Sequence, residues 1–182
     1  IHFDAHPETL KVIELQRHPI DLVHAWWSKK RGGDLCRSPW NVAICGRRGD
    51  DCVHHLAFGW EREYLAMAPL ARIVNMLHGA QMRARDTYKA LPAERREKVM
   101  LVDFDDLTTR PAEVIEKAAG FLGSHTTPAT ARTIRKLRLP YIDGAKRRES
   151  NLQAMEAELD TETRKRLDEM IADYDAGWET AA

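Results

Sequence analysis

The stretch LKVIELQRHPIDLVHAWWSKK, residues 10–30, carries the strongest fold signal in this chain. Its first part is a short apolar run, partly β-branched, which predicts a buried strand over residues 11–16. Pro19 suits the first position of a helix, because its missing N–H would be unpaired there anyway. An arginine, Arg17, therefore stands at the junction of a predicted strand and a predicted helix.

The rest of the chain adds a second strand and further helices. The segment VMLVDF predicts a strand over residues 99–104, and a long amphipathic helical region is expected from about residue 56 to 91, broken near Pro69. Two strands in one layer with helices between them predict parallel pairing, and we assign the crossover to the helix over residues 70–91. The predicted fold class is therefore α/β and helix-rich, with a parallel sheet flanked by helices on both faces.

The second half of the chain contains three more helical segments. Pro111 opens the first, TPATARTIRKLRL forms a short basic one, and Asp160 caps the last. Asp105 and Asp106 are interpreted as structural residues that fix the turn after the second strand. Residues 34–55 are predicted to be irregular, and the segment PYIDGAKRRESN is predicted to be a loop.

Length, charge and cysteine content limit the class of protein. The 182 residues suit one domain, and 28 basic against 28 acidic side chains give a net charge of zero, which argues against bulk nucleic-acid binding. No run is long enough to span a membrane and no signal-peptide pattern is seen. Three cysteines, Cys36, Cys45 and Cys52, are then expected to be reduced thiols in a cytoplasmic protein.

The position of Arg17 predicts an anion site. A strand that ends at the start of a helix presents free N–H groups and the positive end of the helix dipole at the carboxyl edge of the sheet. A guanidinium at this point would bind a phosphate through two N–H donors. The alternative is that Arg17 pairs with a nearby carboxylate such as Asp21, and spacing alone does not decide between the two.

Three blocks of sequence, in order, resemble the sulfotransferases that use 3′-phosphoadenosine 5′-phosphosulfate (PAPS). KVIELQRHPIDLVHAWW is similar to their 3′-phosphate-binding segment, VMLVDFDDLTTRPAEVIEKAAGFLG to a later strand and helix, and RRESNLQAMEAELDTETRKRLDEMIADY to their C-terminal region. The resemblance implies a P-loop-NTPase-like sulfotransferase fold. It also implies transfer of a sulfuryl group from PAPS to a hydroxyl or amine of a small-molecule or carbohydrate acceptor, without a metal.

The resemblance assigns roles to only some residues. Arg17 matches the arginine that holds the 3′-phosphate, and Lys146, Arg147 and Arg148 match a basic cofactor-binding loop, for which a solvated charge run is the equal alternative. The family usually has a serine eight residues after the arginine, and this chain has Ala25 there. Ser28, about one turn further along, is the candidate replacement.

Two parts of the family pattern are missing. The chain contains no Gly/Ser/Thr-rich turn with a lysine that could bind the 5′-phosphosulfate, and its catalytic base is unknown, with His2 as a weak candidate. Two strands also make too small a sheet, so we expect residues 1–182 to be the C-terminal part of a longer single domain that supplies more strands.

Other patterns favour less specific interpretations. Cys52, His54 and His55 in DDCVHH could ligate a metal, but no second cluster at a suitable spacing accompanies them, so no metal site is predicted. The tryptophans near residues 26, 40 and 60 could line an acceptor pocket or pack in the core. The alternative function is a non-catalytic, helix-rich binding module on the same fold.

Overall fold

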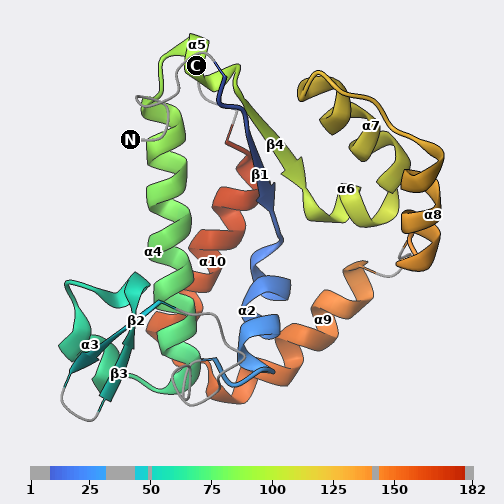
Figure 1. Cartoon of the computed structure of the whole chain (residues 1–182). Coiled ribbons are helices and arrows are strands. Elements are labelled where there is room, and N and C mark those ends of the chain that lie inside the picture. The colour runs from blue at the N-terminus through green and yellow to red at the C-terminus, as the bar shows by residue number, and fades with distance from the viewer. Residues whose placement is uncertain (1–8, 32–43, 49–50, 141–143, 179–182) are drawn as a thin grey trace. The chain divides into compact units, whose positions relative to one another are not determined.

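The computed structural model describes residues 9–31, 44–48, 51–140 and 144–178, and it divides the chain into two compact units. The first, here called the sheet unit, combines Ile1–His18 with Ala90–Arg147. The second, the helical unit, combines Pro19–Lys89 with Arg148–Ala182. Each unit is therefore assembled from two separate stretches of chain (Figure 1). No helix in the described part of the chain is long and apolar enough to cross a membrane.

The sheet unit is built on two parallel strands. Strand β1 (Val12–Gln16) pairs with β4 (Val99–Asp103) in a register that sets Val12 beside Val99 and Gln16 beside Asp103. The predicted parallel pairing is confirmed. The prediction that the first strand is buried is wrong, because Ile13 and Leu15 are 40% and 47% exposed. No further strand joins this sheet among the described residues, because the other two strands, β2 and β3, form a sheet of their own.

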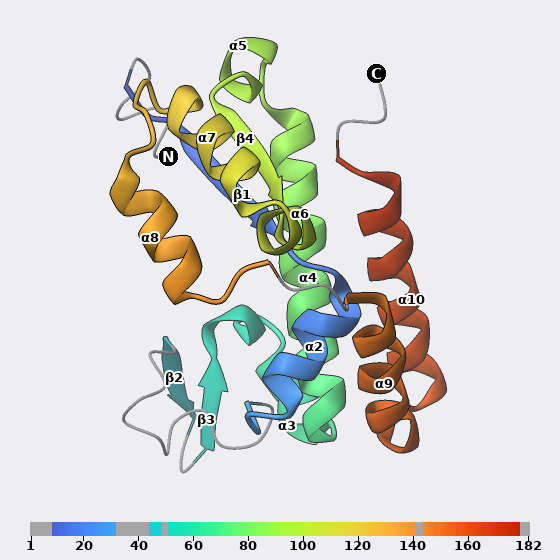
Figure 2. The same cartoon turned by 90° about the vertical axis from the view of Figure 1, so that its right-hand side faces the viewer.

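Short helices surround the second strand of this sheet. Helix α5 (Ala93–Arg96) precedes β4, and α6 (Phe104–Thr109) and α7 (Pro111–Phe121) follow it and pack against it, with α8 (Pro128–Lys136) beside α7 (Figure 2). Pro111 begins α7 as predicted. The predicted strand end at residue 104 is wrong by one residue, because Phe104 already begins α6.

Asp103 explains why β4 ends where it does. Its carboxylate accepts hydrogen bonds from the backbone N–H groups of Asp105, at 2.6 Å, and Asp106, at 3.3 Å, and so caps α6. The side chain of Asp106 instead pairs with Arg110 at 2.5 Å. Asp103 thus caps the turn after the strand, and Asp105 and Asp106, predicted to be structural, contribute their backbone N–H groups to it.

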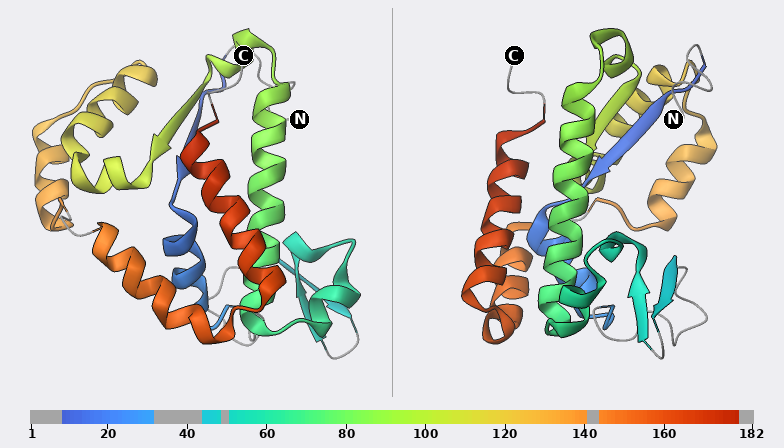
Figure 3. Two further views of the ribbon diagram at one scale, coloured as in Figure 1. Left: turned by 180° about the vertical axis from the view of Figure 1, so that it is seen from behind. Right: turned by 90° about the vertical axis from the view of Figure 1, so that its left-hand side faces the viewer.

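The helical unit has a core of side chains from four helices, α2 (Pro19–Trp27), α4 (Pro69–Ala90), α9 (Gly144–Met155) and α10 (Thr161–Ala176). Helices α4 and α10 run side by side (Figure 3). Asp160 caps α10 as predicted, accepting the N–H of Thr163 at 2.7 Å. The fully buried members of this core come from α2, α4, α9 and α10: Val23, Leu70, Ile73, Val74, Met155, Leu167 and Met170.

The described parts of two segments predicted to be irregular contain regular structure. Strands β2 (Cys45–Arg48) and β3 (Asp51–His54) form an antiparallel pair, followed by a short 3₁₀-helix η1 (His55–Ala57) and α3 (Glu61–Ala66). From Gly144 on, the predicted loop before the last helix belongs to α9, which runs on into a second 3₁₀-helix, η2 (Glu156–Glu158). Both segments are rich in charged residues, so neither shows the apolar periodicity by which helices and strands are recognised.

Candidate functional site

Arg17 lies at the carboxyl end of β1, one residue after the strand ends and two before α2 begins. Its guanidinium carbon lies over the Phe104 ring, 4.9 Å from the ring centroid, which is a cation–π contact. The contact places the guanidinium beside the aromatic ring at the edge of the sheet. A guanidinium fork can bind a phosphate or sulfate through two hydrogen bonds.

Phe104 is a residue whose role the sequence analysis missed. Gln16 and Asp103 are partners in the register of the parallel pair, so the next residue of each chain, Arg17 and Phe104, emerges at the same edge. The signal in the sequence was inexact. Aligning the two predicted strands by their last residues would have set Gln16 beside Phe104, one residue out of the observed register, because the second strand was predicted to end at residue 104.

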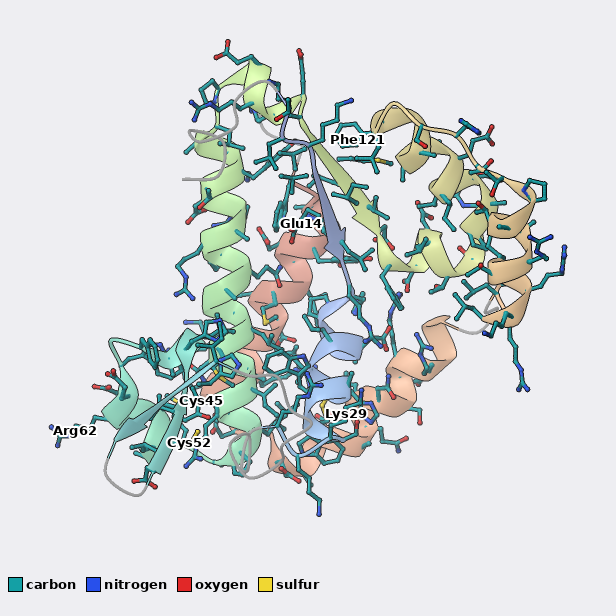
Figure 4. All side chains as sticks on the ribbon, viewed as in Figure 1. Glu14, Lys29, Cys45, Cys52, Arg62 and Phe121 are labelled. Atoms are coloured by element: carbon teal, nitrogen blue, oxygen red, sulfur yellow. The ribbon has the colours of Figure 1, made fainter. Side chains whose placement is uncertain are left out.

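One face of β1 carries two polar side chains that are only partly covered. Glu14 and Gln16 are two residues apart and therefore share a face of the strand. Burial raises the pKa of the Glu14 carboxyl above its usual value. The amide nitrogen Nε2 of Gln16 is buried and has no hydrogen-bond partner among the described residues. Glu14 lies midway along β1 (Figure 4), so it is set back from the strand end that carries Arg17.

A buried ion pair fastens the first turn of α2 within the helical unit. Asp21 is only 1% exposed. One of its carboxylate oxygens accepts a hydrogen bond from Asn151 at 2.8 Å, and the other lies 3.3 Å from Nε of Arg148. Asp21 therefore joins α2 to α9, a contact between residues 127 positions apart in sequence.

The basic segment predicted as a cofactor loop is the first turns of α9. Lys146, Arg147 and Arg148 all lie in this helix. Arg147 is exposed, whereas Arg148 is 22% exposed and engaged with Asp21. The roles of these residues as cofactor ligands stay predictions, and Arg148 also has a structural role in the helical unit.

Ser28 lies just beyond the C-terminal end of α2. Nine residues separate it from Pro19, which corresponds to about 13 Å along the helix axis. Its backbone N–H bonds to the carbonyl of His24 at 2.8 Å, and its hydroxyl is 3.5 Å from the carbonyl of Ala25. A phosphate held at the first turn of α2 would therefore be beyond the reach of this hydroxyl, and binding there would depend on groups other than Ser28.

The described tryptophans have packing partners. Trp27 donates its indole N–H to Glu158 at 3.0 Å, and Trp60 donates to the carbonyl of Leu56 at 3.2 Å. Trp26 packs against both apolar clusters of the helical unit and lies edge-on to His54, with ring centroids 5.8 Å apart. Trp40 lies outside the described residues. The contacts at Trp26, Trp27 and Trp60 favour the packing interpretation over that of an acceptor pocket.

His54 is the most strongly perturbed titratable group described. It is 4% exposed, and its Nδ1 accepts the N–H of Leu56 at 3.1 Å. Burial, followed by the proximity of His55 and Arg31, lowers the pKa of His54 from 6.5 to about 4. The ring is therefore neutral at physiological pH, with its proton on Nε2. It serves as a cap for the 3₁₀-helix η1 rather than as an exposed acid or base.

Two described cysteines differ in oxidation state, and the predicted reduced state is wrong for Cys52. Cys45, on β2, is a free thiol, whereas Cys52, on β3, is disulfide-bonded. Figure 4 labels both residues. Burial raises the pKa of the Cys45 thiol, which makes it a poor nucleophile at neutral pH. No group of three or more ligating side chains that could hold a metal occurs in the described ranges.

This assignment predicts the outcome of alkylating the purified protein. In denaturant without reductant, iodoacetamide should modify Cys45 and leave Cys52 unmodified, because only a thiolate reacts. After reduction both should be modified. Peptide mass spectrometry measures the two sites, and full modification of Cys52 before reduction would contradict the assignment.

His2, the weak candidate for the catalytic base, lies outside the described residues.

No protein-family model, curated protein or solved structure matches this chain.

Proposed function

We propose that the chain is a PAPS-dependent sulfotransferase, or the larger part of one, with the P-loop-like fold of that family. The observation that carries the proposal is the position of Arg17. It follows a parallel strand, stands two residues before the start of α2, and lies over the Phe104 ring. Helix starts and arginine forks both favour phosphate, and the 3′-phosphate is the group by which PAPS differs from common adenine nucleotides.

The proposed reaction is direct sulfuryl transfer to a hydroxyl or amine of a small-molecule or carbohydrate acceptor. A base removes the acceptor proton as the oxygen or nitrogen attacks sulfur in line, the bond from sulfur to the bridging phosphate oxygen breaks, and adenosine 3′,5′-bisphosphate leaves with that electron pair. Arg17 binds and orients the nucleotide, which brings the reacting atoms together without itself taking part in bond breaking. The mechanism proposed requires no metal.

The test is the affinity for adenosine 3′,5′-bisphosphate. Arg17→Ala should weaken binding by about 1.5–3 kcal/mol, or roughly ten- to a hundredfold, because it removes a charge-assisted bidentate contact. The loss should be much smaller for adenosine 5′-phosphate, which lacks the 3′ group. Arg17→Lys should recover only part of the affinity, since an ammonium group cannot form the fork.

Titration calorimetry of both nucleotides against the three proteins, at one salt concentration, measures these differences. Equal losses of affinity for both nucleotides would show that Arg17 does not recognise the 3′-phosphate. No binding by the wild-type protein would favour the second candidate function, a non-catalytic interaction module. The absence of a hydroxyl at Ala25 and the pairing of Arg148 with Asp21 support that second candidate.

A cytoplasmic location is part of the proposal, and one observation argues against it. A structural disulfide such as that of Cys52 persists in oxidising compartments and is rare in the cytosol. The alkylation experiment distinguishes a cytoplasmic location from an oxidising compartment when iodoacetamide is added as the cells are lysed. A reactive Cys52 supports the cytoplasm, and a protected Cys52 supports an oxidising compartment.

A further inference from the structure

Helix α8 and the residues after it form a basic surface without counter-charges. Four cationic side chains lie within seven residues, Arg132, Arg135, Lys136 and Arg138, and all four are exposed. None of them forms an ion pair or hydrogen bond with a side chain in the described part of the chain. No aspartate or glutamate occurs anywhere from Ser124 to Ile142, although the whole chain has as many acidic as basic residues.

The helix concentrates this charge on one side. Arg132, Arg135 and Lys136 are spaced three and four residues apart, so they lie along one stripe of α8. Ile134 is half-buried and lies on the other side of the helix by its position in the sequence. Helix α8 is in contact with α7 (Figure 2). Ala131 and Thr133, on either side of Arg132 in the sequence, are small and exposed.

The pairing of other arginines shows that this arrangement is not general in the protein. Arg85, Arg110 and Arg164 each bind carboxylates at distances between 2.5 and 3.1 Å. Cations kept close together without such partners repel one another, and the repulsion is relieved when an anion binds. The surface is therefore complementary to a ligand that carries several negative charges.

We propose that this surface, Arg132, Arg135, Lys136 and Arg138, binds an anionic polysaccharide. A basic cluster of this length and spacing suits a linear polyanion such as heparin. Nucleic acid is less well matched, because residues 122–140 include no Phe, Tyr or Trp on which bases could stack. A membrane is less well matched as well, because Leu137 is the only exposed large apolar residue among residues 128–138.

The inference is independent of the proposed transferase activity, and binding alone tests it. The test variant carries Arg132→Gln, Arg135→Gln, Lys136→Gln and Arg138→Gln. The matched control carries Arg62→Gln, Arg83→Gln, Lys89→Gln and Lys165→Gln, which removes the same charge from positions of the helical unit that are exposed and, among the described residues, unpaired. Arg62, for example, projects outward from α3 (Figure 4).

The probes are a defined heparin oligosaccharide, a DNA duplex of matched total charge, and phosphatidylserine vesicles, each titrated over a range of salt concentrations. The wild type and the control should bind heparin alike, and the test variant should bind at least tenfold more weakly at low salt. The slope of log affinity against log salt should fall by about three to four units, roughly one for each lost cation contact.

Three outcomes would overturn the inference. Equal heparin affinity of the test variant and wild type would show that α8 does not take part. Equal losses of heparin affinity in the test and control variants would show that binding depends on the net charge of the protein and not on this surface. Tighter binding of wild type to DNA or to vesicles than to heparin would assign the surface to that ligand instead. Far-UV circular dichroism of each variant confirms that the substitutions leave the helices intact.

Discussion

Lowering the pH from 6.5 to 4 should destabilise the helical unit by about 3 kcal/mol through His54 alone. The folded-state pKa of His54 is about 4, below the value of 6.5 expected when the chain is unfolded. Between these pH values the unfolded chain binds a proton at this residue and the folded chain does not. Stability due to the neutral ring is therefore complete above pH 6.5, falls as the pH decreases toward 4, and levels off below it.

Urea unfolding monitored by tryptophan fluorescence measures this loss. All five tryptophans of the chain belong to the helical unit, so the signal reports on the unit that contains His54. His54→Asn is the informative variant, because an asparagine oxygen can accept the N–H of Leu56 but does not titrate. The wild type should lose about 3 kcal/mol more unfolding free energy than this variant when the pH is lowered from 6.5 to 4.

His125 supplies the control for this measurement. It is exposed and belongs to the sheet unit, so His125→Gln should follow the pH dependence of the wild type. A constant difference between wild type and His54→Asn from pH 6.5 to 4 would show that His54 keeps an ordinary pKa in the folded protein. Helical circular dichroism, recorded alongside, separates unfolding from direct quenching of Trp26 by a protonated His54.

Replacing Arg148 by alanine should lower the unfolding free energy of the helical unit by about 3 kcal/mol. Asp21 is 1% exposed, and without Arg148 its carboxylate keeps Asn151 but loses the positive charge beside it. An uncompensated buried charge is what makes the removal of one partner costly. The expected loss of about 3 kcal/mol lies at the lower end of the usual range for breaking a buried ion pair, because Arg148 is itself 22% exposed.

Two further variants separate the effect of the buried charge from that of shortening a side chain on α9. Arg147→Ala, at the exposed neighbouring position, should change stability by no more than about 0.5 kcal/mol. The double variant Asp21→Leu, Arg148→Met should be more stable than Arg148→Ala, because it removes both charges and retains apolar volume. If Arg148→Ala unfolds at the same urea concentration as wild type, the residue has no structural role and its role as a cofactor ligand becomes the simpler interpretation.

The sequence predicted the elements whose signals are local. Both sheet strands were recognisable from their apolar runs, their parallel pairing from the helices between them, and α7 and α10 from Pro111 and Asp160. These features depend on neighbouring residues and on backbone hydrogen bonds, so a short window of sequence contains the information.

The features that the sequence analysis missed depend on contacts between distant residues. The first turns of α9 read as a charged loop, and there Arg148 and Asn151 meet Asp21, a partner more than a hundred residues away. The hairpin of β2 and β3 has the charged sequence GRRGDDC, and Val53 and His54 at its end are buried among side chains from other elements. In the candidate site, Arg17 was predicted and Phe104 was not, because the contact arises from the register of two strands.

The interleaving of the two units limits the order in which a ribosome can complete them. The chain passes between units after His18, after Lys89 and after Arg147, so neither unit is finished by the first stretch that belongs to it. The apolar face of α4 that carries Ile73 and Val74 is synthesised about ninety residues before Leu167 and Met170, which share its core. At typical synthesis rates of 5–20 residues per second, this face waits for roughly 5–20 s without its partners. A nascent chain halted after Arg147 should therefore be a substrate for chaperones that bind exposed apolar segments.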